Sequence, residues 1–160
     1  MISDLSIASR DENRPLPIVL VAHQRPPETY LRALDLVSLG YDCSLSPGSI
    51  DAYGGLLLVG GDDVLPAFYR GDVPARNVNF VKDKLEFNLL HRFIDENKPV
   101  LAICRGFQLV NVFFGGSLKN VNGHMGKQDV YHPVSACGEI FGKLDRVNSA
   151  HRQAVDIVPD

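Results

Sequence analysis

The chain is organised around the stretch Lys98-Pro99-Val100-Leu101-Ala102-Ile103-Cys104-Arg105-Gly106-Phe107-Gln108. Residues 100–103 form a short apolar run of strand type, and an amphipathic apolar segment begins directly after the cysteine. This order predicts a buried strand, a tight elbow at Cys104 and a helix. The free N–H groups at the start of such a helix favour a thiolate and can hold an oxyanion. The stretch therefore predicts a cysteine nucleophile in an α/β protein.

Size, charge and cysteine content are those of a globular protein. The chain has 160 residues, 45% of them hydrophobic and 22% charged, which predicts one domain over 1–160 with a loose lead-in at 1–15. The net charge of −3 gives no reason to expect nucleic acid or an anionic membrane as a partner. No apolar run approaches the ~18–20 residues that span a bilayer, and the N-terminal residues lack the pattern of a secretory signal. The cysteines, Cys43, Cys104 and Cys137, form no disulfide or zinc pattern, which predicts a cytoplasmic location.

Apolar segments of strand length alternate with segments of helical periodicity as far as residue 114. Strands are predicted at 18–22, 41–45, 56–59 and 100–103, and helices at 28–39, 79–97 and from 105 or 106 to 114. Gly40 is expected to cap the first helix, and Gly115-Gly116 to end the third. The alternation predicts a parallel sheet flanked by helices. Two further strands are predicted at 130–135 and 145–148.

Free cysteines are usually small apolar core residues, so Cys104 could be one of these and not a nucleophile. Two glycine positions bear on this choice. Gly106 lies two residues after Cys104 and permits the close backbone crossing of a sharp elbow. Gly60-Gly61 follows the strand at 56–59, and the pair either makes a simple turn or presents a bare N–H toward the site. Neither a Walker-type phosphate loop nor a Gly-x-Gly-x-x-Gly motif occurs.

A cysteine nucleophile normally needs an imidazole base that a third group orients. The five histidines are His23, His91, His124, His132 and His151. His91 falls within the long predicted helix and is expected to be a surface or packing residue. Any one of the others taken alone is more often structural than catalytic. No pair of histidines has the spacing of metal ligands on a helix, so neither a metal nor another cofactor is predicted.

Together these residues resemble the class I glutamine amidotransferase superfamily, and within it the gamma-glutamyl hydrolase branch that includes gamma-glutamyl-gamma-aminobutyrate hydrolases. The segments that carry the resemblance are 55–63 with Pro66 and Tyr69, 98–108, Gly115-Gly116-Ser117-Leu118, and 147–155, with His132-Pro133-Val134 before the last. They occur in the order found in the family. The resemblance covers the chain from about Ile18 to its last residue.

The resemblance implies a three-layer, flavodoxin-like α/β fold and Cys-dependent hydrolysis of a gamma-glutamyl amide through a thioester. Cys104 matches the family nucleophile, and the backbone N–H groups of Gly61 and Arg105 match its oxyanion hole. Gln108 matches a residue near the bound glutamyl group, and Gly60 is expected beside it. The implied partner is a small gamma-glutamyl substrate.

The chain departs from the family in two places. Arg152 occupies a position where relatives often have a second histidine. The family's base comes from a His-Pro-Glu segment beyond the region that 147–155 matches, and no such segment precedes Asp160. His132-Pro133 is followed by Val134 and matches a different, upstream segment. Three explanations follow: a truncated or partial enzyme, a naturally short and inactive homologue, or His151 acting as the base.

The leading function is hydrolysis of gamma-glutamyl amides. The alternatives are a glutaminase subunit that feeds ammonia to a synthase, and a catalytically inactive homologue that binds a ligand or a protein partner. Because the family's final strands and helix cover the sheet, their loss leaves apolar surface open. Such surface favours a homo-oligomer or a partner chain.

Overall fold

The computed structural model describes residues 17–69, 71, 74–125, 131–133 and 146–159, and the predicted lead-in and Cys137 lie outside them. Its elements are β1 (Ile18–Val21), α1 (Glu28–Leu36), β2 (Tyr41–Cys43), β3 (Tyr53–Leu58), the short 3₁₀ helix η1 (Pro66–Phe68), α2 (Phe80–Asp95), β4 (Val100–Ala102), α3 (Arg105–Phe113), β5 (Leu118–Asn120), β6 (Tyr131–Pro133), β7 (Arg146–Asn148) and β8 (Gln153–Val155). The seven strands and helices predicted up to residue 114 are all present, with ends that differ by a few residues.

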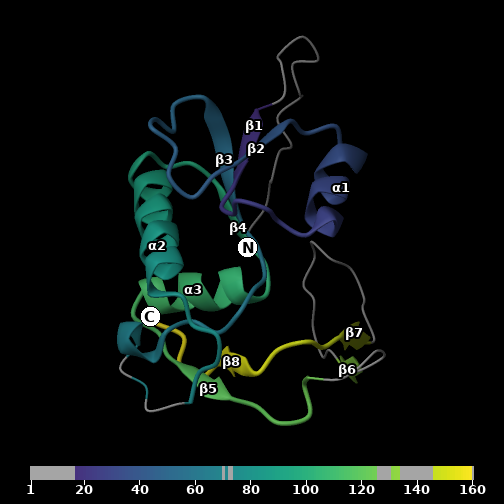
Figure 1. The fold of residues 1–160 in the computed structure, drawn as a ribbon, viewed down its shortest axis with the longest axis vertical. Helices are drawn as coiled ribbons and strands as arrows, with labels where there is room; N and C mark the ends of the chain where they lie inside the picture. The colour runs from purple at the N-terminus through teal and green to yellow at the C-terminus, as the bar shows by residue number, and fades with distance from the viewer. Residues whose placement is uncertain (1–16, 70, 72–73, 126–130, 134–145, 160) are drawn as a thin grey trace, which may run out of the picture.

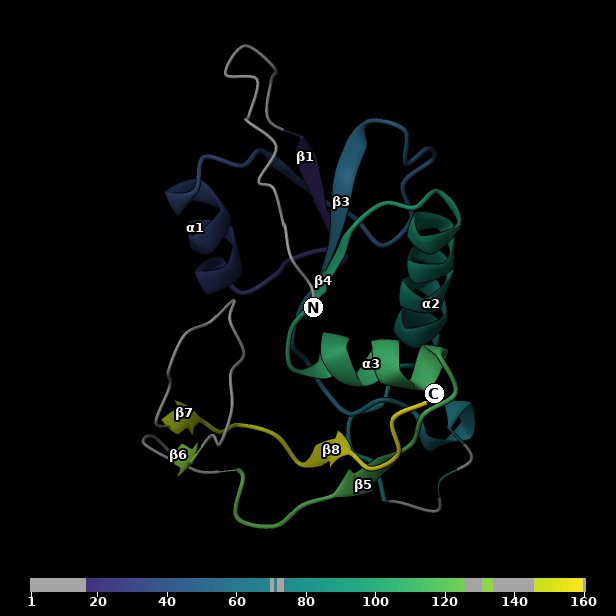
Figure 2. The same cartoon turned by 180° about the vertical axis from the view of Figure 1, so that it is seen from behind.

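Four strands form a parallel sheet in the order β2-β1-β3-β4. Helix α1 lies on one face of this sheet, and α2 and α3 lie on the other (Figures 1 and 2). The arrangement is a three-layer α/β fold, as predicted. Parallel strands all end at the same edge of the sheet, and in such folds that edge carries the functional loops.

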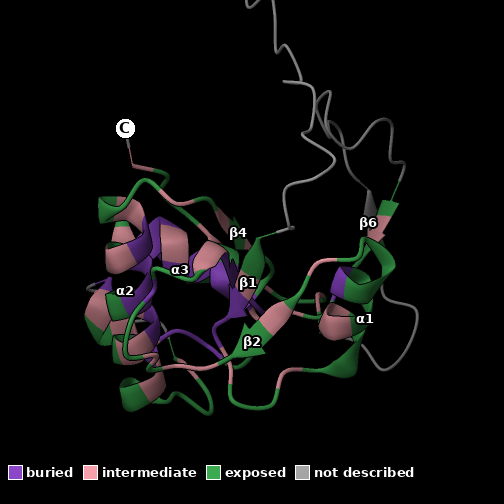
Figure 3. Cartoon of the chain, turned by 90° about the horizontal axis from the view of Figure 1, so that it is seen from above, coloured by how far each residue is buried: buried purple, intermediate pink, exposed green. Residues whose placement is uncertain are grey.

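The core follows from the alternation of side chains along β1 and β3, the two inner strands. Leu20, Ala22, Leu56 and Leu58 pack with Leu89, Leu90, Phe93 and Leu109 of α2 and α3, whereas Val21, Leu57 and Val59 pack with Leu34 of α1. All of these residues are buried, and Figure 3 shows the buried colour concentrated between the sheet and the helices. The continuous apolar runs are therefore strands covered on both faces.

The helix ends show one wrong prediction and one correct one. Gly40 does not cap α1, because the left-handed position is taken by Ser38 at φ 57°. The N–H of Leu39 donates to the carbonyl of Leu34, and the two side chains pack in the same apolar cluster, which completes the capping motif without a glycine. Gly115, at φ 97°, does end α3 as predicted.

Two small antiparallel pairs lie outside the main sheet. β5 pairs with β8, and β6 pairs with β7, so the strands predicted at 130–135 and 145–148 are confirmed where those residues are described. Strands β5 and β8 were not predicted. The pair of β5 and β8 lies beside α3 (Figure 1). The side chain of Gln108 in α3 donates a hydrogen bond to the backbone carbonyl of Gln153 in β8. The segment after β7 is thereby held next to the helix that follows Cys104.

β4 occupies one edge of the main sheet and pairs within it with β3 alone. The side chain of Leu101 in β4 is 57% exposed, and a groove of about 310 Å³ runs beside it with a lining that is almost wholly apolar. In the part of the chain that the structure describes, no helix has the length and apolar character needed to cross a membrane.

Candidate active site

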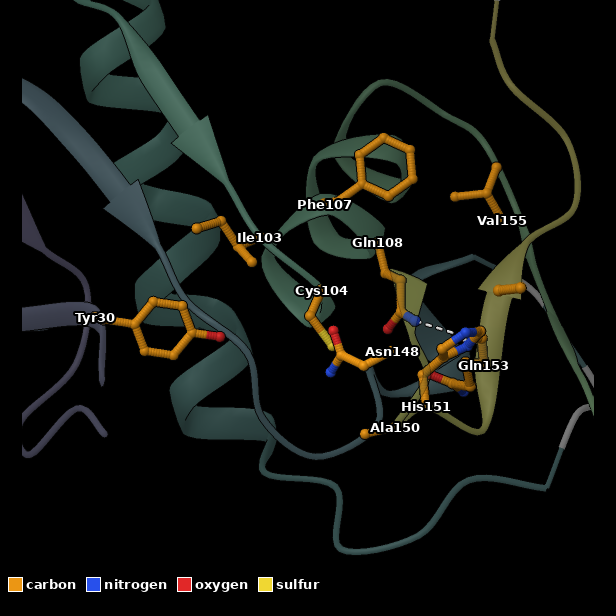
Figure 4. Close-up of a pocket in the computed structure, with 11 residues that line it drawn as sticks. Tyr30, Ile103, Cys104, Phe107, Gln108, Asn148, Ala150, His151, Gln153 and Val155 are labelled. Atoms are coloured by element: carbon orange, nitrogen blue, oxygen red, sulfur yellow. Dashed lines mark hydrogen bonds between the residues drawn. The ribbon is translucent and has the colours of Figure 1, made fainter. Parts of the chain in front are cut away.

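Cys104 forms the elbow between β4 and α3. Its backbone has φ 55° and ψ −113°, a conformation that residues with a side chain rarely adopt. The next residue, Arg105, is the first of α3, so its N–H has no acceptor within the helix. The Cys104 side chain is exposed and faces a cavity at the carboxyl edge of the sheet (Figure 4). The predicted elbow and helix are confirmed. The strand before them is present, but the prediction that it is buried was wrong, because β4 is an edge strand with no buried residue.

Gly106 explains how the elbow can be so tight. A Cβ placed on Gly106 would lie 2.5 Å from the carbonyl oxygen of Leu58 in β3 and 2.8 Å from its carbonyl carbon. Any side chain would therefore collide with backbone, which cannot rotate away as a flexible side chain could. The predicted close crossing of α3 over the sheet occurs at this residue.

The Gly60-Gly61 loop lies against Cys104. A Cβ on Gly60 would lie 3.5 Å from the Cβ of Cys104 and 3.8 Å from its Sγ, and one on Gly61 would lie 3.2 Å from the Cδ of Arg105. A side chain on either glycine would therefore contact an elbow residue, so the loop lies close to the elbow, in agreement with the prediction that it borders a site. The hydroxyl of Tyr30 accepts the N–H of Gly60 at 3.1 Å.

Two cavities meet at Cys104, one of about 530 Å³ and one of about 150 Å³. Both are lined by Cys104, Gln108 and His151, and Gly61 lines the smaller one. Tyr30, Phe107 and Val155 give the larger cavity an apolar side, whereas Asp62, Asp63 and Arg152 make the smaller one polar. The structure thus brings four of the predicted site residues, Cys104, Gly61, Gln108 and His151, together at one edge of the sheet.

His151 lies in the segment between β7 and β8. Its Nδ1 is 2.9 Å from the carbonyl oxygen of Gln153, and its ring centroid is 4.8 Å from that of His124. Because a carbonyl can only accept, Nδ1 carries the hydrogen in this bond, and in the neutral ring Nε2 is then the basic nitrogen. This is the tautomer that a base needs, and the Gln153 carbonyl is the group that accepts from Nδ1.

Gln108 is buried and ties α3 to β8. Its Nε2 donates to the backbone carbonyl of Gln153 at 2.6 Å. The side chain of Gln153 in turn accepts the N–H of Val64 at 3.0 Å and donates to the hydroxyl of Tyr69. Burial and the nearby Asp63 carboxylate raise the pKa of Tyr69, so it stays a neutral partner. These contacts fix one wall of both cavities.

Arg105 sends its side chain away from the two cavities and into α2. The guanidinium donates to Asp83 and Glu86, which lie one turn apart, and all three side chains are at most 3% exposed. Neither carboxylate was predicted to matter, since a pattern of apolar positions does not identify partners for polar ones. Their spacing of three residues on one helix was the available signal.

His23, at the end of β1, lies near this group of charges in a third cavity of about 300 Å³. Burial and then the positive charges of Lys82 and Arg105 lower the pKa of His23. The N–H of Arg25 donates to its Nδ1 at 2.9 Å, a bond that the neutral ring accepts. His91, by contrast, is an exposed residue of α2 paired with Asp95, as expected.

Tyr30 and Asn148 also line the larger cavity and were not predicted as site residues. The helical periodicity of 28–39 makes Tyr30 an apolar position of that helix, and nothing in its local sequence indicates a bond to a loop thirty residues away. At Arg152, the position that departs from the family, Nε lies 3.5 Å from Oδ2 of Asp63. Within the described residues, no group of three or more His, Cys, Asp or Glu side chains is arranged to hold a metal ion.

Comparison with known proteins gives one family. The "Peptidase C26" family model matches residues 36–160. A Schizosaccharomyces pombe protein named "Putative glutamine amidotransferase PB2B2.05" is 34% identical over 90 residues, which are 54% of this chain and 34% of that protein. The Mycobacterium tuberculosis protein "Putative glutamine amidotransferase Rv2859c" is 33% identical over 126 residues, or 68% of this chain and 41% of that one.

The fold is also found in a solved structure. A glutamine amidotransferase from Thermotoga maritima superposes with a TM-score of 0.61 at 17% identity, covering 91% of this chain and 64% of that one. The matched stretch spans about a third of the length of curated relatives such as the Schizosaccharomyces pombe protein. The family model covers well over half of the present sequence, and its match includes Cys104 and the loop after β3. The chain therefore belongs to the Peptidase C26 family of class I glutamine amidotransferase-like proteins.

Proposed function

We propose that the chain carries the nucleophile and oxyanion hole for Cys-dependent hydrolysis of a gamma-glutamyl amide. The observation that carries the proposal is the strained elbow. It exposes Cys104 in a cavity at the start of α3, with Gly60 and Gly61 in contact with the elbow. Family membership supports the same chemistry, and a Campylobacter jejuni relative that is 29% identical over 76 residues is named "Gamma-glutamyl-CDP-amidate hydrolase".

In the proposed reaction the thiolate of Cys104 attacks the amide carbon. A C–S bond forms and the carbonyl π pair moves to oxygen, where the N–H groups of Gly61 and Arg105 hold it. The pair then returns, the C–N bond breaks, and the leaving nitrogen takes a proton from the protonated base. Water, deprotonated by the same base, attacks the thioester and releases glutamate and the thiolate.

We infer that His151 is the base of the described chain. The support is that His151 and Cys104 line the same two cavities, and that the bond from Nδ1 to the Gln153 carbonyl makes Nε2 the basic nitrogen of the neutral ring. His151→Ala should then abolish turnover while the melting temperature stays close to that of the wild type. Unchanged turnover would refute this assignment.

A second candidate function is a ligand- or partner-binding homologue without turnover. The observation in its favour is that the bond orienting His151 ends on a backbone carbonyl, which stabilises an imidazolium less than a carboxylate does. The two candidates differ in what happens after the thiol reacts. In a binding module Cys104 could be reactive or unreactive, but in either case the protein would not release glutamate.

One experiment separates the candidates. The purified protein and Cys104→Ala are treated with a glutamine-like electrophile and with gamma-glutamyl-p-nitroanilide, and the protein mass and nitroaniline release are measured. An adduct that is lost in Cys104→Ala, together with turnover, supports the hydrolase. An adduct without turnover supports a reactive thiol without a working base. If neither an adduct nor nitroaniline release is detected, the catalytic proposal is refuted.

A further inference from the structure

Arg105 has two parts that face different surroundings. Its backbone N–H stands at the start of α3 beside Cys104, and its guanidinium is buried against α2. Nη2 donates to Oδ1 of Asp83, and Nη1 donates to Oε2 of Glu86. We call Arg105, Asp83 and Glu86 the Arg105 cluster. Two charge-assisted bonds to one helix fix both the position and the plane of the guanidinium.

The anchor itself is rigid. α2 has sixteen residues, and Leu89, Leu90 and Phe93 on its buried side are at most 1% exposed in the main core. A guanidinium fixed to this helix limits how far the first turn of α3 can move. The buried side chain of Arg105 therefore also holds the backbone N–H of Arg105 in place.

Asp83 also holds the other side of the site. Its Oδ2 accepts the N–H of Leu65 at 3.0 Å, in the loop that begins with Gly60 and Gly61. The close approach of Gly61 to the Cδ of Arg105 brings the same loop against the Arg105 side chain. One carboxylate thus connects the two segments that carry the proposed oxyanion donors, Gly61 and Arg105.

The charges of the cluster balance with the help of Lys82. Its Nζ lies 3.5 Å from Oε1 of Glu86, an oxygen that makes no hydrogen bond among the described residues. Two carboxylates then face two cations. Buried ion clusters add little stability compared with apolar side chains of the same volume, so stability alone does not account for this one.

We propose that the Arg105 cluster is a positioning device for the oxyanion hole. Asp83 and Glu86 hold the backbone N–H of Arg105, and through the Gly60–Leu65 loop that of Gly61, where an oxyanion forms on attack by Cys104. The proposal rests on the proposed function, because it needs an oxyanion at that place. Asp83 and Glu86 are positioning residues that touch neither the substrate nor the thiol.

The test compares two reactions of one thiol. Acylation by p-nitrophenyl acetate forms a C–S bond, moves the carbonyl pair to oxygen, and then expels p-nitrophenolate. Alkylation by iodoacetamide displaces iodide at a saturated carbon and forms no oxyanion. The ratio of the two rates cancels any change in thiol ionisation. It is measured in a Cys43→Ser, Cys137→Ser background, where Cys104 is the only thiol.

The variants are Asp83→Asn, Glu86→Gln and Arg105→Lys, with Arg92→Lys as the control. Arg92 also tethers α2, through bonds to the carbonyls of Pro47 and Gly48, but these lie away from the elbow. Loss of one oxyanion donor costs about 10²–10³ in rate. We expect the ratio to fall at least about tenfold in the cluster variants, whereas Arg92→Lys leaves it within about twofold.

The reference thiol is Cys43, measured alone in Cys104→Ala, Cys137→Ser. If the ratio at Cys104 does not exceed that at Cys43, no oxyanion hole exists and the proposed function fails together with this inference. The other refuting result is a ratio at Cys104 that exceeds the ratio at Cys43 but stays at the wild-type value in folded Glu86→Gln or Asp83→Asn. That result refutes the positioning role alone. A loss of cooperative melting in Arg105→Lys leaves the decision to the two isosteric amide variants, whose shapes match the native carboxylates.

Discussion

Gly106→Ala tests whether the close crossing of α3 over β3 is what fixes the elbow. The added Cβ would lie 2.5 Å from the Leu58 carbonyl oxygen and 2.8 Å from its carbonyl carbon, so backbone must move. Helix propensity alone would favour alanine by up to about 1 kcal/mol. Overpacking of a well-packed site costs roughly 1–3 kcal/mol, and the contact here is with backbone.

Because backbone cannot rotate away, the overpacking cost should lie in the upper part of that range, and after the gain in helix propensity we expect a net loss of roughly 1–2 kcal/mol in the free energy of unfolding for Gly106→Ala. In a chain of this size that corresponds to a fall of roughly 2–8 °C in melting temperature. The assay is urea unfolding followed by circular dichroism, with iodoacetamide alkylation of Cys104 measured on the folded variant. Because the elbow has to shift, the alkylation rate should change as well.

Gly48→Ala is the matched control. A Cβ on Gly48 would meet nothing within 4 Å, and its φ is not positive. Alanine there reduces the freedom of the unfolded chain, so its stability should be unchanged or higher by up to about 1 kcal/mol. If Gly106→Ala were as stable as Gly48→Ala, the explanation of the elbow by steric contact would be wrong.

Three further predictions follow from single contacts. Tyr30→Phe removes the acceptor for the N–H of Gly60 and should lower stability by about 1 kcal/mol in urea unfolding, with a lower acylation rate at Cys104. Because burial and two neighbouring cations lower the pKa of His23, the unfolded chain binds more protons just below pH 6.5, so stability should fall as pH drops through that value and the slope should lessen in His23→Gln. Burial and Asp42 raise the pKa of Cys43, so its alkylation near pH 8 should be slow and should still rise with pH above 9.

The sequence predicts those parts of the fold that depend on local patterns. The apolar runs at 18–22 and 56–59 are strands because both of their faces are covered, which a run without alternation indicates. The elbow could be predicted from Cys104 and Gly106 because a turn of this kind is a property of adjacent residues. The same holds for the end of α3 at Gly115.

The features that were missed depend on contacts between distant residues. β5 and β8 are three residues long and pair Leu118 with Val155, so neither has a recognisable pattern of its own. Arg105 finds its carboxylates 19 and 22 residues away. Gly40 was wrong as a cap because the packing of Leu39 on Leu34 outweighs the preference for glycine at the left-handed position, which Ser38 takes.

The predictions for the site divide in the same way. Cys104, Gly61, Gln108 and His151 were expected near one another. Cys104, Gln108 and His151 line both cavities, and Gly61 lines the smaller one. Their chemical roles, and that of the Arg105 N–H, stay predictions until the thiol reactions are measured. The sequence offers no local signal for Tyr30, which comes to the site from the opposite layer of the fold (Figure 4).

The backbone of Cys104 also decides which variant is a fair control. At φ 55° a residue with a Cβ is strained by about 1–3 kcal/mol, whereas glycine is not. Cys104→Gly would remove the thiol and relax the turn together, and a gain in stability would accompany the loss of reactivity. Cys104→Ala keeps the same strain and changes the chemistry alone. A selection for stability without activity would therefore favour glycine at this position.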